Sequence, residues 1–186
     1  MRVTGESEDA LLYAAAETFG RDGYAATSLD EVARLAGVGR GAVYHRFGTK
    51  AALFRAALVL RQRRLAERFV AASSVRTGWD ALRAGCAVLL DAYLDPKVRR
   101  MLLIDGPAVL GPEQVRSIED GHVGELLRRG LQRATGDQDV EARLSVLRGA
   151  IGEAGLLLGR DHSALGALGR EIESVLDAFE RNPAPA

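Results

Sequence analysis

Apolar residues recur along most of the chain at steps of three and four, the spacing that places them on one face of a helix. Short stretches rich in Gly, Pro, Ser and Thr separate these runs and favour turns. The pattern predicts an all-α protein of about nine helices, the first over residues 8–21. Two short helices follow it, and the remaining six are expected at about 50–73, 79–94, 98–104, 113–134, 140–158 and 165–179.

Two short apolar sets lie between Thr27 and Lys50. Thr27 or Ser28 can cap the first helix, because a short hydroxyl side chain satisfies the unpaired N–H groups of a first turn. Gly37 is expected to end that helix, because the left-handed conformation strains glycine least. The second apolar set continues to Phe47. Two short helices joined by a turn that contains glycine form a helix-turn-helix, which this spacing predicts, although a generic helical hairpin shares part of the pattern.

The second short helix combines small residues with basic and aromatic ones. Gly41 and Ala42 are small enough to let a helix approach base edges closely. Arginine, tyrosine and histidine side chains can reach bases and phosphates. The helix carries four such side chains: Arg40, Tyr44, His45 and Arg46. We expect Arg40 and Tyr44 to contact base edges; the alternative is a basic helix face that only water solvates.

These residues lie in a longer stretch, from about Leu11 to Leu58, that resembles the TetR/AcrR (tetracycline-repressor) family of bacterial transcription regulators. The matching run is AAAETFGRDGYAATSLDEVARLAGVGRGAVYHRFGTKAALF. Few other families end a recognition helix with the Tyr-His-x-Phe-Gly-Thr-Lys segment found here. The resemblance implies a three-helix helix-turn-helix DNA-binding domain over residues 1–50 and a larger helical effector-binding and dimerisation domain over residues 51–186.

The resemblance also bears on the DNA contacts. It implies that Lys50, at the start of the fourth helix, binds a phosphate. The family's first helix often follows a basic arm, but Arg2 is the only basic residue before Arg21 here, which argues against an arm in the minor groove. Hydroxyl and histidine side chains are expected to hold phosphates as well. The predicted DNA contacts are therefore Thr27, Ser28, Arg40, Gly41, Ala42, Tyr44, His45, Thr49 and Lys50.

The formal net charge is zero, but the charges are unevenly distributed. Residues 1–64 carry ten Lys/Arg and seven Asp/Glu, a net charge of +3, and the remainder carries fifteen and eighteen, a net charge of −3. Between Val32 and Ala66 there are eight basic residues and no acidic one. Such a block is the electrostatic footprint of a DNA-binding protein. Surface charge that only aids solubility is the alternative.

Composition places the chain among ordinary globular proteins. Hydrophobic residues make up 47% of its 186 residues and charged ones 27%, which argues against a disordered chain. Cys86 is the single cysteine, so no intramolecular disulfide forms, and its apolar neighbours favour a small core residue over a redox switch. The sequence shows neither a signal peptide nor an apolar run of about 18 residues, so we expect a cytoplasmic protein.

One apolar break in the second half of the chain points to an effector site. Residues 105–112 hold two prolines and two glycines, so we expect a loop there, lying against a cavity. This stretch also resembles the corresponding one in a subgroup of the family. The predicted pocket takes a small hydrophobic effector. Its expected lining residues are Tyr93, Leu103, Val109, His122 and Leu126.

His122 lies on or beside the apolar face of its expected helix. A core or pocket-edge histidine with satisfied hydrogen bonds is the simpler interpretation, and a hydrogen bond to the effector is the other. Glu119 and His122 are three residues apart, but two ligands do not make a metal site. We therefore expect no metal and no cofactor.

The last two expected helices repeat apolar residues about every 3.5 residues, the period of helices packed nearly parallel or antiparallel in a four-helix bundle. Interior glycines add a second stripe, although each costs about 1 kcal/mol relative to alanine, so we expect close helix approach there. The predicted homodimer pairs these two helices from each subunit, with an intrachain bundle as the alternative. Its interface residues are Leu144, Leu147, Ile151, Gly152, Gly155, Leu168, Ile172 and Val175. The tail from Asn182 to Ala186 is expected to be disordered.

Together these features predict a ligand-responsive DNA-binding transcription regulator, a repressor that a small hydrophobic effector releases from a palindromic operator. A constitutive DNA-binding regulator without an effector is the alternative. An enzyme is not expected, because the sequence has no Gly-rich phosphate loop, G-x-S-x-G elbow, H-E-x-x-H or paired cysteines. Asp161-His162-Ser163 is better explained as a helix connection with capping residues. No membrane partner is expected.

Overall fold

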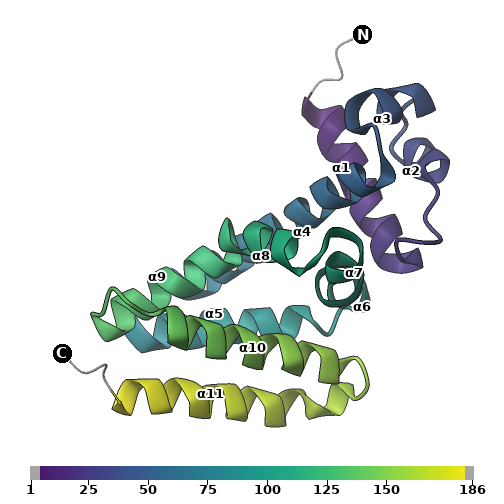
Figure 1. The fold of residues 1–186 in the computed structure, drawn as a ribbon. Helices are drawn as coiled ribbons and strands as arrows, with labels where there is room; N and C mark the ends of the chain where they lie inside the picture. The colour runs from purple at the N-terminus through teal and green to yellow at the C-terminus, as the bar shows by residue number, and fades with distance from the viewer. Residues whose placement is uncertain (1–4, 183–186) are drawn as a thin grey trace. The chain divides into compact units, whose positions relative to one another are not determined.

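The computed structural model describes residues 5–182, in which every regular element is a helix (Figure 1). The expected all-α class is confirmed. Residues 5–182 form eleven α-helices. The number exceeds the expected nine because one expected loop is helical and one expected helix is divided in two. Arg2 and the tail residues 183–186, on which two of our expectations fall, lie outside the described residues. The chain forms two compact units, residues 1–62 with 96–116 and residues 63–95 with 117–186.

The first unit contains a three-helix head and the start of a long fourth helix. Its first elements are α1 (Gly5–Asp22), α2 (Leu29–Leu35), α3 (Arg40–Phe47) and residues 50–62 of α4 (Lys50–Ser73). An aromatic cluster joins α1 to α4. Phe54 meets the rings of Phe19 and Tyr24 edge-on, with centroid distances of 5.0 and 5.3 Å. Aliphatic side chains complete this core: Leu11, Ala15, Val32, Val43, Leu53 and Ala57.

Residues 96–116 also belong to the first unit and are almost entirely helical. They form α6 (Pro96–Arg99), a π-helical turn (Arg100–Asp105), α7 (Gly106–Leu110) and the start of α8 (Pro112–Asp120). The prediction of a loop over residues 105–112 was wrong. Pro107 lies in the first turn of α7 and Pro112 begins α8, positions where a missing N–H breaks no helical hydrogen bond. Within this stretch Gly111 leaves the helical conformation, with a φ of 84°.

This helical segment binds the end of α1. Lys97 Nζ lies 2.7 Å from Glu17 Oε2, and the Tyr24 N–H donates to Asp105 Oδ2 at 2.9 Å. α1 and α6 approach so closely at Gly20 that a Cβ there would lie 2.6 Å from the Lys97 Cβ. Lys97 and Asp105 therefore hold the end of α1 in place, although they follow their partners by 80 and 81 positions in the chain.

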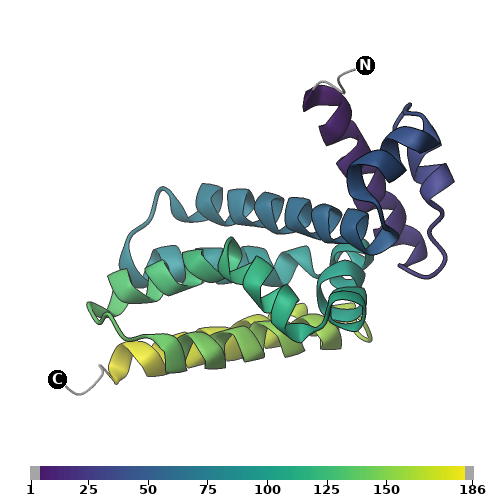
Figure 2. The ribbon, with the colours of Figure 1, turned by 45° about the horizontal axis from the view of Figure 1, so that its top comes forward.

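The second unit is a helical bundle with its own core (Figure 2). It contains α5 (Gly78–Ala92), α9 (Val123–Thr135), α10 (Glu141–Leu158), a 3₁₀ turn (His162–Ala164), α11 (Leu165–Arg181) and the ends of α4 and α8. α5 packs on α9, α10 and α11, and α10 runs beside α11. Cys86 is 1% exposed, so its expected place in the core is confirmed. None of the helices in residues 5–182 combines the length and apolarity that spanning a bilayer requires.

The single helix expected over residues 113–134 was wrong, because the chain breaks between α8 and α9. His122 has φ −136° and ψ −102°, outside the helical region, after a glycine at position 121 that weakens the helix. In a continuous helix the Ile118 carbonyl would accept from the backbone N–H of residue 122. That N–H instead donates to the Glu119 carbonyl at 2.9 Å, and His122 Nδ1 lies 2.7 Å from the Ile118 oxygen. The histidine ring thus takes the place of the lost backbone donor.

Candidate nucleic-acid interface

α2 and α3 form a compact helix-turn-helix within the first unit, as predicted. Gly37 adopts a φ of 67°, the left-handed conformation that ends α2. The Val38 N–H then donates to the Ala33 carbonyl at 3.0 Å, which closes the turn. Val32 and Val43 fill the core beneath the two helices and are at most 1% exposed. These contacts hold α3 in place and leave its other face open.

The open face of α3 carries the predicted recognition residues. Arg40, Tyr44 and His45 are all exposed. Apart from Gly41's own neighbours and helix backbone, no described atom lies within 4 Å of a Cβ placed on it, and Ala42 is half-buried. Polar side chains therefore flank a strip of bare backbone, a geometry that admits close approach to base edges in a major groove.

Exposed contacts orient the arginines of this face. The Arg40 guanidinium lies over the Tyr44 ring, 5.4 Å from its centroid, and Arg40 Nε lies 3.0 Å from Asp30 Oδ1. Arg46 pairs with Glu8 on α1. Exposed ion pairs contribute about 1 kcal/mol or less, so a phosphate or base can replace the carboxylate at little cost. The stacking places Arg40 and Tyr44 side by side on the exposed face of α3.

Two of the predicted phosphate contacts are open to solvent. Ser28 and Thr49 are exposed, and Ser28 forms no side-chain cap on α2. Thr49 Oγ1 accepts from the Ala52 N–H at 3.1 Å, which leaves the hydroxyl proton available to donate. Both hydroxyl groups can therefore bind a phosphate oxygen.

Two other predicted phosphate contacts are bonded inside the unit. Lys50 Nζ donates to the Ala25 carbonyl at 2.9 Å and lies 4.8 Å from the centroid of the Tyr24 ring, with two further protons to donate. Thr27 is 4% exposed, and its hydroxyl donates to the Gly23 carbonyl at 2.7 Å. A hydroxyl has one proton, and the Gly23 carbonyl already accepts that of Thr27. This bond and the burial of the side chain argue against the predicted phosphate contact of Thr27.

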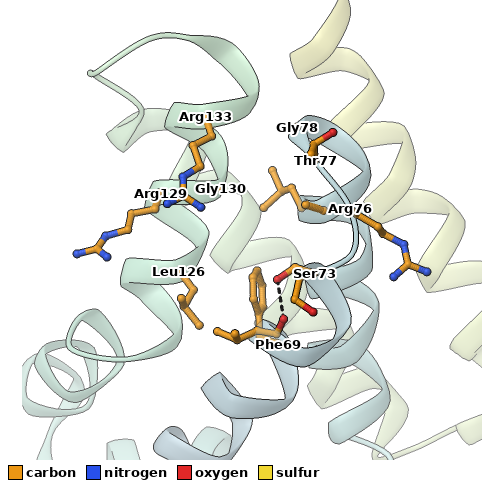
Figure 3. A pocket seen from close by; sticks show the side chains of 13 residues that line it. Phe69, Ser73, Arg76, Thr77, Gly78, Leu126, Arg129, Gly130 and Arg133 are labelled. Atoms are coloured by element: carbon orange, nitrogen blue, oxygen red, sulfur yellow. Dashed lines mark hydrogen bonds between the residues drawn. The ribbon is translucent and has the colours of Figure 1, made fainter.

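Three cavities of the second unit bear on an effector. The first, of about 500 Å³, lies between the end of α4, the start of α5 and α9 (Figure 3). The second is a groove of about 570 Å³ between α4 and α9. The third, of about 190 Å³, lies between α5 and α11. Cys86 borders this third cavity, and burial raises the pKa of its thiol to about 12.

The five predicted pocket residues are not brought together at one of these cavities. Leu126 borders both larger cavities, and His122 borders the groove. Tyr93 is buried in the second unit, whereas Leu103 and Val109 belong to the first. Sequence reasoning missed Arg129 and Arg133, which line the 500 Å³ cavity from α9. Their spacing of four residues on α9 was the available signal, because residues four apart share a helix face.

The predicted dimer residues fall into two groups. Buried inside the second unit are Leu144, Leu147, Ile151, Gly155 and Ile172. Half-buried are Gly152, Leu168 and Val175. Within one chain, the periodic apolar seam of α10 and α11 thus packs largely into the core of the unit.

A neighbouring face of α10 is open. Val146 is 54% exposed and Leu156 is 37% exposed. Between them, a Cβ placed on Gly149 or Gly152 would have no described atom within 4 Å apart from its chain neighbours and the backbone of its own helix. Exposed aliphatic side chains therefore flank a stretch of bare helix backbone.

Two family models match the chain. Residues 11–57 match bacterial regulatory proteins of the tetR family, and residues 79–179 match the tetracyclin repressor-like C-terminal domain. The HTH-type transcriptional regulators SrpR and TtgW of Pseudomonas putida are each 34% identical over 95 residues, 51% of this chain. The match spans 43% of SrpR and 69% of TtgW. A solved TetR-family transcriptional regulator from Pectobacterium atrosepticum is similar with a TM-score of 0.76 and 28% identity, over 98% of this chain and 100% of that one.

Proposed function

Because the chain belongs to the tetR family of bacterial regulatory proteins, which are DNA-binding transcription regulators and not enzymes, we propose that it is a repressor that a small-molecule effector releases from a palindromic operator. In this proposal residues 1–50 bind DNA, and residues 51–186 bind the effector and form a homodimer. The protein acts in the cytoplasm, where bacterial DNA is reached without crossing a membrane.

The exposed face of α3 is the observation that carries the proposal. Arg40 and Tyr44 contact base edges, since a guanidinium can bond to two acceptors of a guanine. Gly41 and Ala42 let α3 lie deep in the major groove, because neither side chain holds the helix away. The remaining contacts bind phosphates and set the register of the protein on the duplex. They come from Ser28, His45, Thr49 and Lys50.

A second copy of the chain covers the open face of α10 in this proposal. Val146 and Leu156 offer aliphatic surface, and the bare backbone at Gly149 and Gly152 allows a partner helix to approach closely. Burial of this surface favours association at about 25 cal/mol per Å² of apolar area. A two-fold dimer presents two copies of α3 to successive major grooves and so reads a palindrome.

The effector acts through a difference in affinity between two states of the dimer. α4 contributes residues 50–62 to the first unit and 63–73 to the second, so one continuous helix connects the DNA-binding head with the helices that border the cavities. An effector that binds more tightly when the head spacing does not fit the operator depopulates the DNA-bound state. Equal affinity for both states would release nothing.

Fluorescence anisotropy with DNA from upstream of the protein's own coding sequence tests DNA recognition. We expect saturable binding with a Kd of about 10⁻⁸ M or tighter, and steep weakening by salt as phosphate contacts release counterions. Tyr44→Ala should lose specific binding, at least about tenfold in Kd. Tyr13→Ala removes a similarly exposed tyrosine from α1, outside the helix-turn-helix, and should bind like wild type. Equally weak binding of wild type and Tyr44→Ala to any duplex contradicts the proposal.

The same complex separates an effector-released repressor from a constitutive regulator. Release of the labelled operator by a small molecule, at protein concentrations where the operator is saturated, supports the repressor. Transcription from the neighbouring promoter in vitro then distinguishes repression from activation. A complex that no ligand class dissociates favours the constitutive alternative.

A further inference from the structure

The cavity between α4, α5 and α9 has a volume that suits a small organic ligand. It measures about 500 Å³, within the usual range of ligand pockets. All of its lining residues belong to the second unit, so the site is complete within that unit. Figure 3 shows its walls, with α9 on one side and the end of α4 and the start of α5 on the other.

Every charged side chain that lines this cavity is an arginine. Arg129 and Arg133 lie on α9 and Arg76 in the turn on the opposite wall, and Figure 3 shows the Arg129 and Arg76 side chains extending away from the space between the walls in opposite directions. Arg129 pairs with Glu125 at 2.6 Å, and Arg76 Nη1 donates to the Ala72 carbonyl at 2.6 Å. Arg133 makes no ion pair with any residue from 5 to 182. The lining therefore carries positive charge that the described residues only partly neutralise.

Apolar side chains line the cavity from all three helices. Phe69 and Leu82 line the cavity from α4 and α5, and Leu126 lines it from α9. The groove of about 570 Å³ shares Val70, Ser74 and Leu126 with this cavity. The cavity and the groove therefore adjoin at these three residues.

We infer that this cavity binds an amphipathic monoanion, with a carboxylate at Arg133 and an apolar chain over Phe69, Leu82 and Leu126. Hydrogen bonds between guanidinium and carboxylate are strong because both groups are charged. A neutral apolar molecule offers no carboxylate to Arg133, and a cation meets like charges. The inference names the chemical class of the proposed effector. It rests on the proposed function for the release of DNA, but the binding of the ligand itself does not depend on that function.

Trp79 provides a direct readout of binding in the absence of DNA. It is the only tryptophan of the chain, is half-buried, and follows Gly78, which lines the cavity. Decanoate, 1-decanol and decyltrimethylammonium share one alkyl chain and differ in head-group charge. We expect decanoate to change the Trp79 emission saturably, 1-decanol to bind at least about tenfold more weakly and the cation not to bind. Added NaCl should weaken decanoate binding.

Paired variants locate the site. Arg133→Gln should raise the Kd for decanoate about tenfold, whereas Arg160→Gln, at an exposed arginine outside the cavity, should change it by less than about twofold. Ala81→Phe fills the cavity from α5 and should abolish binding. Ala87→Phe, at an exposed position of the same helix, should not. Wild-type affinity in all four variants, or equal affinity for the three alkyl ligands, overturns the inference.

A parallel measurement of operator binding keeps this inference distinct from the proposed function. Decanoate binding by a protein that recognises no operator leaves the site standing and removes the regulator proposal. Operator binding without any decanoate response at Trp79 removes the site and leaves the regulator standing. Decanoate binding that releases the operator, and that Arg133→Gln weakens, supports both.

Discussion

Replacing Gly20 with valine tests the contact between α1 and α6 in the first unit. A Cβ at Gly20 would lie 2.6 Å from the Cβ, 3.1 Å from the Cα and 3.2 Å from the carbonyl oxygen of Lys97. Two of these three atoms belong to the backbone, so a different Lys97 rotamer does not relieve the clash. α6 has to move away from α1, and valine requires a larger movement than alanine.

The size of the effect follows from two opposing contributions. Overpacking of this kind costs about 1–3 kcal/mol. Helix propensity offsets about 0.5 kcal/mol, because valine is only a moderately better helix former than glycine. The free energy of unfolding should therefore fall by about 0.5–2.5 kcal/mol, and the Tm by about 2–4 °C for each kcal/mol in a chain of this length. Gly20→Ala should lie between wild type and Gly20→Val, since alanine regains about 1 kcal/mol of helix propensity.

Urea unfolding followed by far-ultraviolet circular dichroism measures this loss. Gly41→Val is the matched control, because Gly41 is also helical and in the same unit, but a Cβ placed on it meets no described atom within 4 Å beyond its chain neighbours and its own helix backbone. Its free energy of unfolding should stay within about 0.5 kcal/mol of wild type. A Gly20→Val protein with the urea midpoint of the Gly41→Val control would refute the close approach of α1 and α6.

Three further changes test other parts of the structure. Because burial raises the pKa of the Cys86 thiol to about 12, a thiol reagent should label it at pH 8 only after unfolding, and rapid labelling of the native protein contradicts this. Burial raises the pKa of Glu17, but hydrogen bonds from Lys97 and Arg61 outweigh it and bring the pKa below 4.5. Ionised Glu17 thus stabilises the fold at neutral pH, and Glu17→Gln should have a lower urea midpoint than wild type there. This difference in midpoint should close as the pH falls below 4.5 and Glu17 is protonated. A difference that stays constant with pH indicates another cause. Gly152→Leu, in open space on α10, should weaken the dimer in sedimentation velocity without lowering monomer stability, and dimers that survive it contradict the proposed interface.

The helix-turn-helix could be predicted because its causes are local. Gly37 takes the left-handed conformation that its place after an apolar set requires. Val32 and Val43 are buried as their spacing predicts, since helical period alone decides which side chains share a face. The open strip around Gly41 follows from the same period.

The two wrong elements show where local rules were insufficient. Two prolines in residues 105–112 predict a loop, but each lies in the first turn of its own helix, where no N–H is needed. The apolar period through residues 113–134 predicted one helix. It carried no sign that the His122 ring would replace a backbone donor at Ile118.

The helical class, the head with its exposed α3 and the buried cysteine could be predicted from the sequence, because periodicity and turn residues act over a few positions. The packing of residues 96–116 on α1 and the hydrogen bond of the Thr27 hydroxyl inside the head became evident only in the folded chain. The fold also brings Arg76 to the same cavity as two arginines of α9. These features join residues that are distant in the chain or depend on which rotamer a packed side chain adopts, and no local pattern encodes such contacts.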